Sequence, residues 1–416
     1  MKSWTRPLIP RLPGAGPLPH LHDTATNSLQ TASPAPGEAA SLYVCGITPY
    51  DATHIGHAAT YLAFDTLVRL WIDAGLDVNY AQNTTDVDDP LLERANDRGL
   101  DWRALADNQT DLYRGDMESL GVIPPDHFIA VTEVIDPMAD AVATLLERGI
   151  GYRLEGDPFA DVYFDSAAAS RFSDWRLGDE SRLDEATMLE FSALRGGDPD
   201  RPGKRDPLDP LLWRGARPGE PRWSTVVGTG RPGWHIECSV IAARHLALPA
   251  TVNGGGIDLV FPHHEFSAGH TAALTGEHLA GIYAHTCLVS YQGEKMSKSL
   301  GNLVFVSELV AAGRDPRAVR LAILGQHHRV PWEWTEDLLT EAEERLARWT
   351  GWAAGAPAGL ARDNALDELR RILSNDLDTA GALELIDARI SDGTAADEVS
   401  VAAIDALLGV RLVGLD

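Results

Sequence analysis

Short apolar runs alternate with amphipathic stretches in the first part of the chain, as expected for a fold built on a parallel sheet. The run "SLYVCG" (41–46) predicts a short buried strand, and "AATYLAFDTLVRLWIDAG" (58–75) has the spacing of a helix that ends near Gly75. A second strand is predicted at "DVNYAQNTTD" (77–86), followed by a helical stretch from about Pro90. Strand, loop, helix and strand in this order predict an α/β unit.

The same pattern divides the chain into five segments. Residues 1–40, rich in Pro and Gly, predict an extended, partly packed arm, and residues 41–149 form the first α/β half. Residues 150–222 have many turn residues and no strong period, so they predict an insertion of surface loops. The α/β pattern returns over residues 223–305, and residues 306–416 predict a helical bundle.

Strands are also expected in the second α/β half. "ATVNGGGIDLVFPHH" (250–264) predicts a strand and a glycine-rich turn, and "IYAHTCLVSY" (282–291) predicts another single strand.

Composition and charge limit the classes of partner. The 416 residues carry a net charge of −26, and residues 331–416 alone hold 7 Arg, no Lys and 18 acidic residues, a net of −11. Such a chain repels nucleic acid unless it has a local basic face. No apolar run is long enough for a membrane span, and the start of the chain lacks the apolar core of a secretory signal. We therefore expect a cytoplasmic protein that binds neither nucleic acid nor membranes.

Cysteine usage is sparse, with Cys45, Cys238 and Cys287 far apart in the sequence. In a reducing compartment these three residues predict buried thiols, metal ligands or catalytic groups rather than a disulfide framework.

Two short motifs follow strands and suggest phosphate chemistry. "HIGH" (54–57) lies where a strand gives way to a helix, whose N-terminus favours phosphate, and Gly56 permits close approach of the backbone. "KMSKS" (295–299) offers Lys295 and Lys298, which can neutralise a triphosphate as charge moves onto pyrophosphate. Each motif alone is equally compatible with surface histidines or an exposed basic turn; the two together, in this order, are much more specific.

Together the motifs resemble the signatures of class I aminoacyl-tRNA synthetases. The segments "CGITPYDATHIGHA", "NTTDVDDP", "PGWHIECS", "GGGIDLVFPHHE" and "KMSKSLGN" are similar to the cysteinyl-tRNA synthetase pattern over most of residues 40–305. The resemblance implies an α/β fold: a Rossmann-like catalytic domain with a parallel sheet and an insertion, followed by a C-terminal helical bundle. Residues 41–149 and 223–305 would be the two halves of its nucleotide-binding part.

The resemblance also implies one zinc ion per chain, with Cys45, Cys238 and His263 as ligands. Two thiolates and an imidazole are a normal zinc set, and three protein ligands leave a position open for a substrate thiol. From the residues alone, either His235 or His264 could be a ligand, and spacing alone would favour Cys45 and Cys238 as buried hydrophobic residues. We assign Cys287 to the core.

Two departures point to a relative of the cysteinyl-tRNA synthetases. Ser267 stands where those enzymes have a fourth zinc ligand, a Glu, and only 117 residues follow Ser299, which we expect to be too few for a bundle and an anticodon-reading domain. "LRGGDP" (194–199), which has Leu where the relative has Glu, the following "RPGKRDPLD" and the N-terminal "SW…LPG.GP" pattern resemble the mycothiol-pathway ligases. Those enzymes join cysteine to the amine of glucosaminyl-inositol.

This resemblance implies two half-reactions on small-molecule substrates: L-cysteine, ATP with Mg²⁺ and glucosaminyl-inositol. His54 and His57 would steady the phosphates, Lys295 and Lys298 would close over the departing pyrophosphate, and no residue is identified as the general base for the amine. The expected adenylate-binding residues are Cys45, Gly46, Ile47, Thr48, Thr60, Asn83, Thr84, Thr85, Trp234, Gly256, Ile257, Asp258 and Val289. Of these, Trp234 is equally compatible with a core aromatic and Asp258 with a structural cap.

Two alternatives to this ligase remain. A cysteinyl-tRNA synthetase would share the first half-reaction and differ in the acceptor. A catalytically inactive, synthetase-like binding module would have no need of intact "HIGH" and "KMSKS" motifs. We expect a monomeric enzyme.

Overall fold

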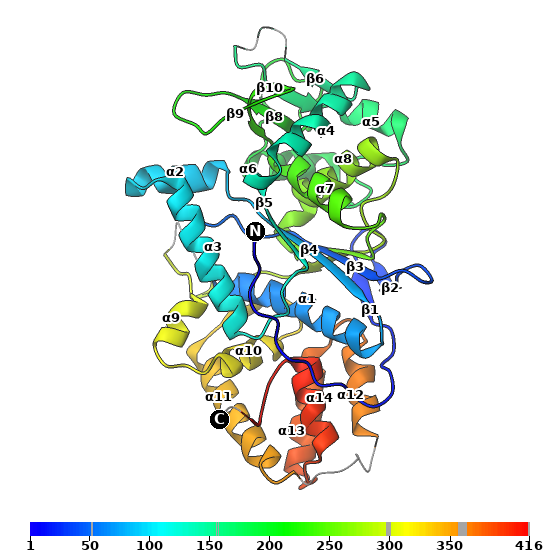
Figure 1. Cartoon of the computed structure of the whole chain (residues 1–416), viewed down its shortest axis with the longest axis vertical. Helices are drawn as coiled ribbons and strands as arrows, with labels where there is room; N and C mark the ends of the chain where they lie inside the picture. Colours follow the sequence, from blue (N-terminus) through cyan, green and yellow to red (C-terminus); the bar gives the residue numbers. More distant parts are fainter. Residues whose placement is uncertain (51–52, 155, 157, 297–300, 357–363, 415–416) are drawn as a thin grey trace.

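A computed structural model describes every residue of the chain except 51–52, 155, 157, 297–300, 357–363 and 415–416. A parallel sheet crosses the middle of the molecule, the insertion lies at one end and the C-terminal helices lie at the other (Figure 1). The central sheet therefore lies between the insertion and the C-terminal helices.

The central sheet has five parallel strands in the order β12-β11-β3-β4-β5. They are β3 (Ala40–Val44), β4 (Val78–Thr84), β5 (His127–Ala130), β11 (Val252–Gly256) and β12 (Tyr283–Thr286). Strands β4 and β5 lie on one side of β3, and β11 and β12 lie on its other side. The strand order therefore reverses beside β3. Ligands bind at such a switch point in open α/β sheets. This confirms the predicted α/β fold with a parallel sheet.

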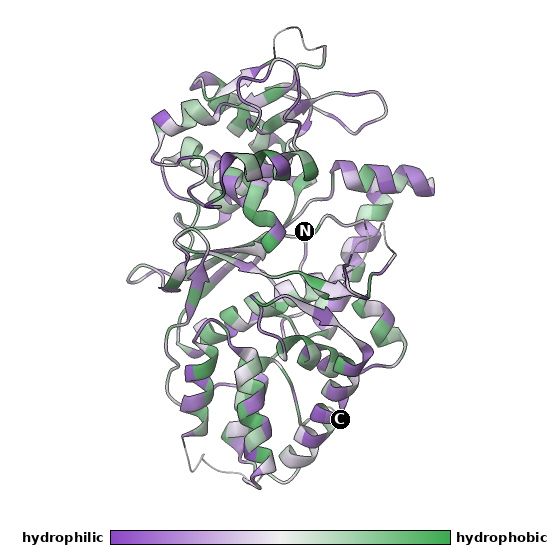
Figure 2. Ribbon diagram, turned by 180° about the vertical axis from the view of Figure 1, so that it is seen from behind, coloured by the Kyte–Doolittle hydropathy of each residue, from purple (hydrophilic) through white to green (hydrophobic). Residues whose placement is uncertain are grey.

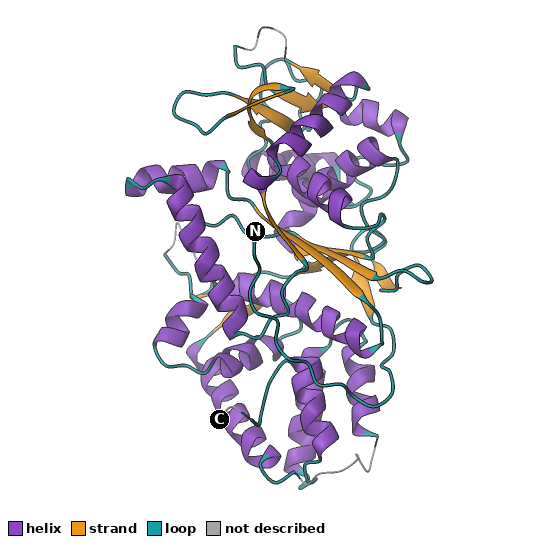
Figure 3. Ribbon diagram, in the orientation of Figure 1, coloured by secondary structure: helices purple, strands orange, loops and turns teal. Residues whose placement is uncertain are grey.

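Helices cover both faces of this sheet (Figure 3). Helix α1 (Ile55–Asp73) packs on one face and α7 (Trp234–His245) packs on the other, where α8 (Glu265–Thr275) and α4 (Ile135–Glu147) pack in turn against α7. Alternate residues of β3 enter the two resulting cores: Leu42 and Val44 pack with α1, whereas Tyr43 and Cys45 pack with α7. Side-chain alternation along a strand thus places Cys45 on the α7 side.

The insertion folds as a sheet of its own rather than as the expected surface loops. Its five antiparallel strands have the order β6-β7-β8-β10-β9, and the sheet continues past residue 222. The strands are β6 (Gly151–Arg153), β7 (Val162–Phe164), β8 (Leu211–Gly215), β9 (Trp223–Thr225) and β10 (Gly228–Pro232), and the accompanying helices are α5 (Ser166–Phe172) and α6 (Glu185–Leu194). Fully buried Trp213 and Phe164 from these strands fill a core that periodicity did not reveal, because each strand is too short to show a period.

Two small sheets contain the remaining described strands. The expected arm contains a hairpin of β1 (His20–Asp23) and β2 (Ser28–Thr31). The predicted single strand 282–291 is in fact two: β12 joins the central sheet, and β13 (Val289–Tyr291) pairs with β14 (Glu294–Lys295) and β15 (Trp332–Trp334).

The remaining described helices lie mostly in the C-terminal part, where many show one hydrophobic and one hydrophilic face (Figure 2). They are α2 (Asp89–Arg98), α3 (Trp102–Ser119), α9 (Val306–Ala311), α10 (Pro316–Leu324), α11 (Glu336–Ala353), α12 (Ala365–Leu373), α13 (Thr379–Ser391) and α14 (Glu398–Leu408). Among the described residues, no helix has both the length and the apolar character needed to cross a membrane.

A buried ionic junction joins α1 to the C-terminal helices. Asp65 on α1 accepts hydrogen bonds from Arg69, 2.7 Å away, and from Arg320 on α10, and all three side chains are fully buried. The two arginines also donate to main-chain carbonyls at the ends of α14 and α3. Carbonyls at helix C-termini carry the negative end of the helix dipole, so they help to balance the second positive charge.

We predict that Asp65→Asn lowers the free energy of unfolding by about 3–5 kcal/mol, because it leaves two buried guanidinium groups without their counter-ion. Urea denaturation followed by circular dichroism measures this loss. Burial alone would raise the pKa of Asp65, but Arg69 and Arg320 hold it below its ordinary value. The stabilisation is therefore present at neutral pH and is lost only as pH falls through the lowered pKa.

Asp111→Asn is the matched control, since Asp111 pairs with Arg114 on the surface and is 72% exposed. Its effect should stay within about 0.5 kcal/mol. Equal effects of the two substitutions would contradict a special role for the buried junction.

Candidate active site

A cavity of about 500 Å³ opens at the carboxyl end of the central sheet, where β3 and β11 end side by side. Ten of the residues expected from the sequence to bind the adenylate or its phosphates line it together with other side chains. They are Gly46, Ile47, Thr48, His54, His57, Thr60, Trp234, Gly256, Asp258 and Val289. Cys45, expected both at the adenylate and at the metal, lines the same cavity.

The "HIGH" segment starts helix α1 at the wall of this cavity. His54 is the N-cap residue: its Nδ1 accepts a hydrogen bond from the amide of His57 at 3.4 Å, and the two rings stack with centroids 3.8 Å apart. A Cβ at Gly56 would lie 2.9 Å from the His54 ring, so glycine is needed for this stacking. Both imidazoles thus sit at the positive end of a helix dipole, where an anion is stabilised.

The segment after the "KMSKS" motif is hydrogen-bonded to the "HIGH" segment. The amide of Ile55 donates to the carbonyl of Val304 at 2.9 Å, and the amide of Val306 donates to the carbonyl of Thr53 at 3.1 Å. Within the motif, the first residue, Lys295, ends β14, and the second, Met296, lines the cavity. Lys298 lies outside the described residues. The backbone therefore brings both motifs to one cavity although about 240 residues separate them in the sequence.

Four expected binding residues are not among the described residues that line the cavity: Asn83, Thr84, Thr85 and Ile257. The Asn83 Oδ1 atom accepts from the amide of Gly46 at 2.8 Å, and its side-chain amide donates to Thr85 at 3.1 Å. Thr85 in turn donates to Glu237 at 3.0 Å. In this structure these polar groups support the cavity wall from behind.

Gly46 allows β3 and β4 to approach closely at this point. A Cβ at Gly46 would overlap the main-chain carbonyl of Asn83, which belongs to a buried strand and cannot swing away. The requirement for glycine here is one of space and not of backbone conformation.

Cys45, Cys238 and His263 form a buried cluster beside the cavity. The two sulfurs are 3.6 Å apart, His263 Nε2 lies 3.1 Å from Cys238 Sγ, and the three ligand atoms are all within 4.8 Å of one another. Tetrahedral zinc would place two sulfurs about 3.8 Å apart and sulfur and nitrogen about 3.6 Å apart. The donor set and its spacing therefore fit a zinc ion, and a sulfur–sulfur distance of 3.6 Å is far too long for a disulfide.

His235 and His264, which were also possible ligands by residue type, lie outside the cluster and contact its members. His235 Nδ1 lies 3.1 Å from His263 Nδ1, and His264 Nε2 lies 3.1 Å from Cys45 Sγ. The hydroxyl of Ser267 donates to the main-chain carbonyl of His263 at 2.7 Å, so it is used within the helix. Partners of this kind orient metal ligands and set their tautomers.

A hydrogen-bonded chain leads from Cys45 to the N-terminal hairpin. His264 Nδ1 lies 2.7 Å from His285 Nε2, and His285 Nδ1 lies 2.7 Å from the Thr24 hydroxyl. Burial lowers the pKa of His264 far below its usual value and that of His285 to about 3, so both rings are neutral. Neutral rings can pass hydrogen bonds along this chain in either direction, according to their tautomers. Sequence spacing contained no sign of this chain, which joins residues 24 and 285.

The pKa values of the two neighbouring thiols are shifted in opposite directions. Burial raises the pKa of Cys45, and the neighbouring Cys238 raises it further. Burial would also raise the pKa of Cys238, but the hydrogen bond from Cys45 and the nearby His263 lower it well below its usual value. The lowered pKa favours the thiolate at Cys238, the form that binds metal.

Several lining residues were not predicted from the sequence. Cys287, assigned to the core, is only half-buried and lines the cavity, with its thiol 2.7 Å from the carbonyl of Arg329. Tyr50, Tyr61 and Leu303 also line it. Their aromatic or aliphatic character is that of ordinary core residues, so no sequence signal marks them.

Known proteins resemble this chain over most of its length. The family described as "tRNA synthetases class I (C) catalytic domain" matches residues 31–344. An L-cysteine:1D-myo-inositol 2-amino-2-deoxy-alpha-D-glucopyranoside ligase from Clavibacter michiganensis subsp. michiganensis is 58% identical, over 99% of each chain. The protein of the same description from Micrococcus luteus is 55% identical, over 99% of this chain and 100% of its own.

The chain belongs to this cysteine-type branch of the class I synthetase family. Its similarity to the ligases confirms the predicted family and ligase class, and cysteinyl-tRNA synthetases are more distant relatives.

Solved class I synthetases share the fold. The structure of Mycobacterium tuberculosis methionyl-tRNA synthetase bound by methionyl-adenylate is similar with a TM-score of 0.60 and 17% identity, over 90% of this chain and 89% of its own. LeuRS from Agrobacterium radiobacter, in a ternary complex, is similar with a TM-score of 0.59 and 15% identity, over 91% and 84%.

We predict that Gly46→Ala damages the active site of this class I enzyme, because the new methyl group pushes β3 away from β4 where the cavity begins. Overpacking of this kind costs about 1–3 kcal/mol of stability, so the thermal midpoint of unfolding should fall by several degrees. Adenylate formation should fall at the same time. Differential scanning calorimetry and ATP–pyrophosphate exchange measure the two effects.

Gly351→Ala is the matched control, since Gly351 lies on the exposed face of α11 and a Cβ there meets nothing within 4 Å. This substitution should leave activity unchanged and stabilise slightly, as Ala does in a helix. Normal activity of the Gly46 variant would contradict the close approach described above.

Proposed function

We propose that this enzyme joins L-cysteine to the amine of glucosaminyl-inositol, through a cysteinyl-adenylate, with release of AMP and diphosphate. One observation carries the proposal: Cys45 belongs to the Cys45–Cys238–His263 cluster and also lines the cavity. Residues of both signature motifs line the same cavity. A thiol-binding cluster and an ATP-binding signature at one cavity suit the activation of cysteine. The relatives described as ligases of this acceptor support the second half-reaction.

In the first half-reaction, the cysteine carboxylate attacks the α-phosphate of ATP, and diphosphate leaves. His54 and His57 at the start of α1 would hydrogen-bond the phosphates, with the helix dipole behind them. Lys295 and Lys298 would stabilise the charge on the departing diphosphate, and Mg²⁺ would accompany ATP. Trp234, which lines the cavity and stacks on His263 with centroids 4.3 Å apart, would close the amino-acid end.

The residues expected to hold a zinc ion are Cys45, Cys238 and His263. A bound zinc ion would offer an open coordination position that a cysteine thiolate fills far better than the hydroxyl of serine. His235 and His264 would hold the ligands in place from outside the cluster. Ser267, whose hydroxyl is bonded to the helix backbone, would leave that fourth position to the substrate.

In the second half-reaction, the amine attacks the carbonyl carbon of the adenylate, and AMP leaves with the bonding electrons. A small polyhydroxylated amine needs only a pocket beside the adenylate. The net charge of −11 over residues 331–416 disfavours the phosphate contacts that a tRNA acceptor requires. We further propose that the enzyme works as a monomer in the cytoplasm, where its three free cysteines would remain reduced.

We predict that the purified enzyme contains one zinc ion per chain and that Cys238→Ala loses it, because one of three ligands is removed. Metal analysis after gel filtration measures the ion content. The variant should also lose cysteine-dependent ATP–pyrophosphate exchange, and serine should not support exchange in the wild type. Cys287→Ala is the control, since Cys287 lies outside the cluster, and it should retain the metal. Full zinc content in the Cys238 variant would refute the ligand set.

We predict that the wild-type enzyme forms an amide with glucosaminyl-inositol and does not charge cysteine tRNA. The experiment offers each acceptor to enzyme, ATP and radiolabelled cysteine, and follows both AMP release and the labelled product. Efficient charging of tRNA without amide formation would refute the proposed acceptor and support a cysteinyl-tRNA synthetase.

A further inference from the structure

A second cavity, of about 600 Å³, lies next to the first, on the side of the insertion. The two cavities share the wall residues Thr48, Tyr50, Trp234, Asp258 and Leu259. Residues 194–198 of the insertion motif line the second cavity, and Arg195 of this motif donates to the main-chain carbonyl of Asp258 at 2.8 Å. A molecule in the second cavity would therefore lie against whatever occupies the first.

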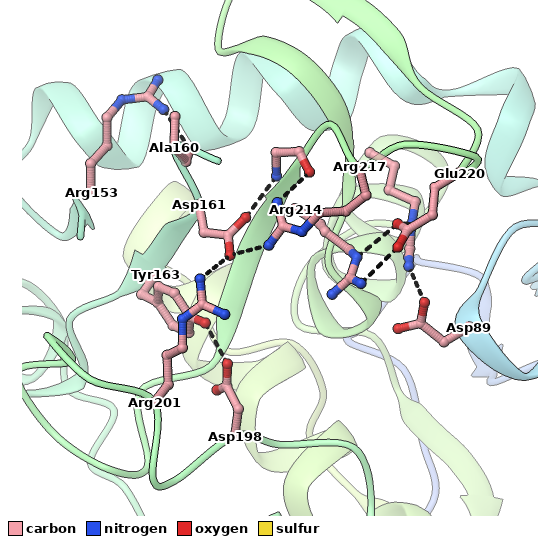
Figure 4. Close-up of polar contacts among 12 residues, drawn as sticks. Asp89, Arg153, Ala160, Asp161, Tyr163, Asp198, Arg201, Arg214, Arg217 and Glu220 are labelled. Carbon is pink, nitrogen blue, oxygen red and sulfur yellow. Dashed lines mark hydrogen bonds and ion pairs between the residues drawn. The ribbon is translucent and has the colours of Figure 1, made fainter. Parts of the chain in front are cut away.

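Several charged side chains in the wall of the second cavity form ion pairs, and Figure 4 shows those around Arg214, Glu220 and Asp89. Arg231 on β10 forms an ion pair with Asp89 at the start of α2 and lies 3.6 Å from Glu220. Arg214 makes two hydrogen bonds to Glu220, at 2.9 and 2.8 Å. These contacts fasten the insertion sheet to the start of α2 and hold the cavity wall rigid.

Other acidic groups of the lining are also engaged. Asp198 is paired with Lys204 at 3.1 Å, and Asp209 accepts from Tyr152 at 2.8 Å and from the amide of Ser166 at 3.0 Å. Paired charges of this kind offer hydrogen bonds to the hydroxyl groups of a neutral polyol without attracting a free ion strongly.

Asp88 differs from these neighbours. It lines the second cavity, is half-buried, and is the N-cap of α2, where one oxygen accepts from the amide of Asp89 at 2.8 Å. Within the part of the chain that the structure describes, its other oxygen has no hydrogen-bond partner, and the carboxylate has no ion pair. One carboxylate oxygen is thus available to a group in the cavity.

The surroundings of Asp88 favour a carboxylate that can accept a proton near neutral pH. Burial raises the pKa of Asp88 to about 6, while the Asp89 amide and Arg231 oppose the rise. The other charged or titratable groups that influence it are Asp89 on its own helix, His263 after β11 and Glu237 on α7. A base with a pKa close to the working pH is suited to general-base catalysis.

We propose that the second cavity binds the acceptor and that the free oxygen of Asp88 receives the proton of its attacking amine. This inference rests on the proposed function. The amine nitrogen forms a bond to the adenylate carbonyl carbon, the bond from that carbon to the phosphate oxygen of AMP breaks, and AMP leaves with the electron pair. The proton lost by the nitrogen passes to the Asp88 carboxylate, so charge and atoms balance. The ligand class is a primary amine on a sugar or polyol.

The test compares the two half-reactions in Asp88→Asn, since Asn remains a good N-cap and keeps α2 in place. Cysteine-dependent ATP–pyrophosphate exchange reports the first step. The second step is measured in single turnover: preformed enzyme-bound cysteinyl-adenylate is mixed with glucosaminyl-inositol, and labelled amide is followed. We expect exchange within about twofold of wild type and amide transfer slower by about 100-fold or more.

Two further variants sharpen the result. Asp97→Asn removes one charge from an exposed position of the same helix, away from the cavity, and should leave both steps unchanged. Asp88→Glu restores a carboxylate and should recover much of the transfer rate.

Normal transfer in Asp88→Asn, or an equal loss in both steps, would overturn the role of Asp88 while leaving the proposed function intact. Absence of amide product in the wild type, with normal exchange, would instead overturn the proposed acceptor, and this inference with it.

Discussion

The parallel pairing of β3 with β4 on one side and with β11 on the other is the constraint on which the active site depends. It aligns the carboxyl ends of three strands that come from distant parts of the chain. Alternation along β3 then directs Cys45 toward α7, which carries Cys238. The close approach at Gly46 leaves no room for a side chain, so the geometry of the cluster follows from the register of the sheet.

Two other contacts hold distant segments in place around this sheet. Backbone hydrogen bonds between residues 53–55 and 304–306 hold the segment that follows "KMSKS" against the start of α1, which carries the two signature histidines. Farther along the same helix, Asp65 anchors the C-terminal helices through Arg69 and Arg320. Helix α1 therefore acts as a rigid link between the phosphate-binding end of the active site and the C-terminal half.

Much of the fold and site followed from local pattern. The apolar run before Cys45 and the amphipathic stretch after His57 predicted β3 and α1, because a buried strand and a helix each leave a period in the sequence. The antiparallel sheet of the insertion was missed, since strands of three to five residues between turn-rich loops show no period. Segment 282–291 was read as one strand because its apolar residues continue across the point where the chain leaves one sheet for another.

The sequence by itself determined the chemistry available to this protein: the two signature motifs, the thiols and imidazoles that suit a metal, and the acidic character that disfavours nucleic acid. Only the tertiary structure decided which histidine faces which sulfur and that Asn83 and Thr85 lie behind the cavity wall. It also placed Asp88 at a second cavity, with one oxygen that has no partner among the described residues. The physical reason is that residue type and local period are properties of neighbouring positions. Contacts such as that between residues 45 and 264 form only when the sheet and its covering helices have packed together.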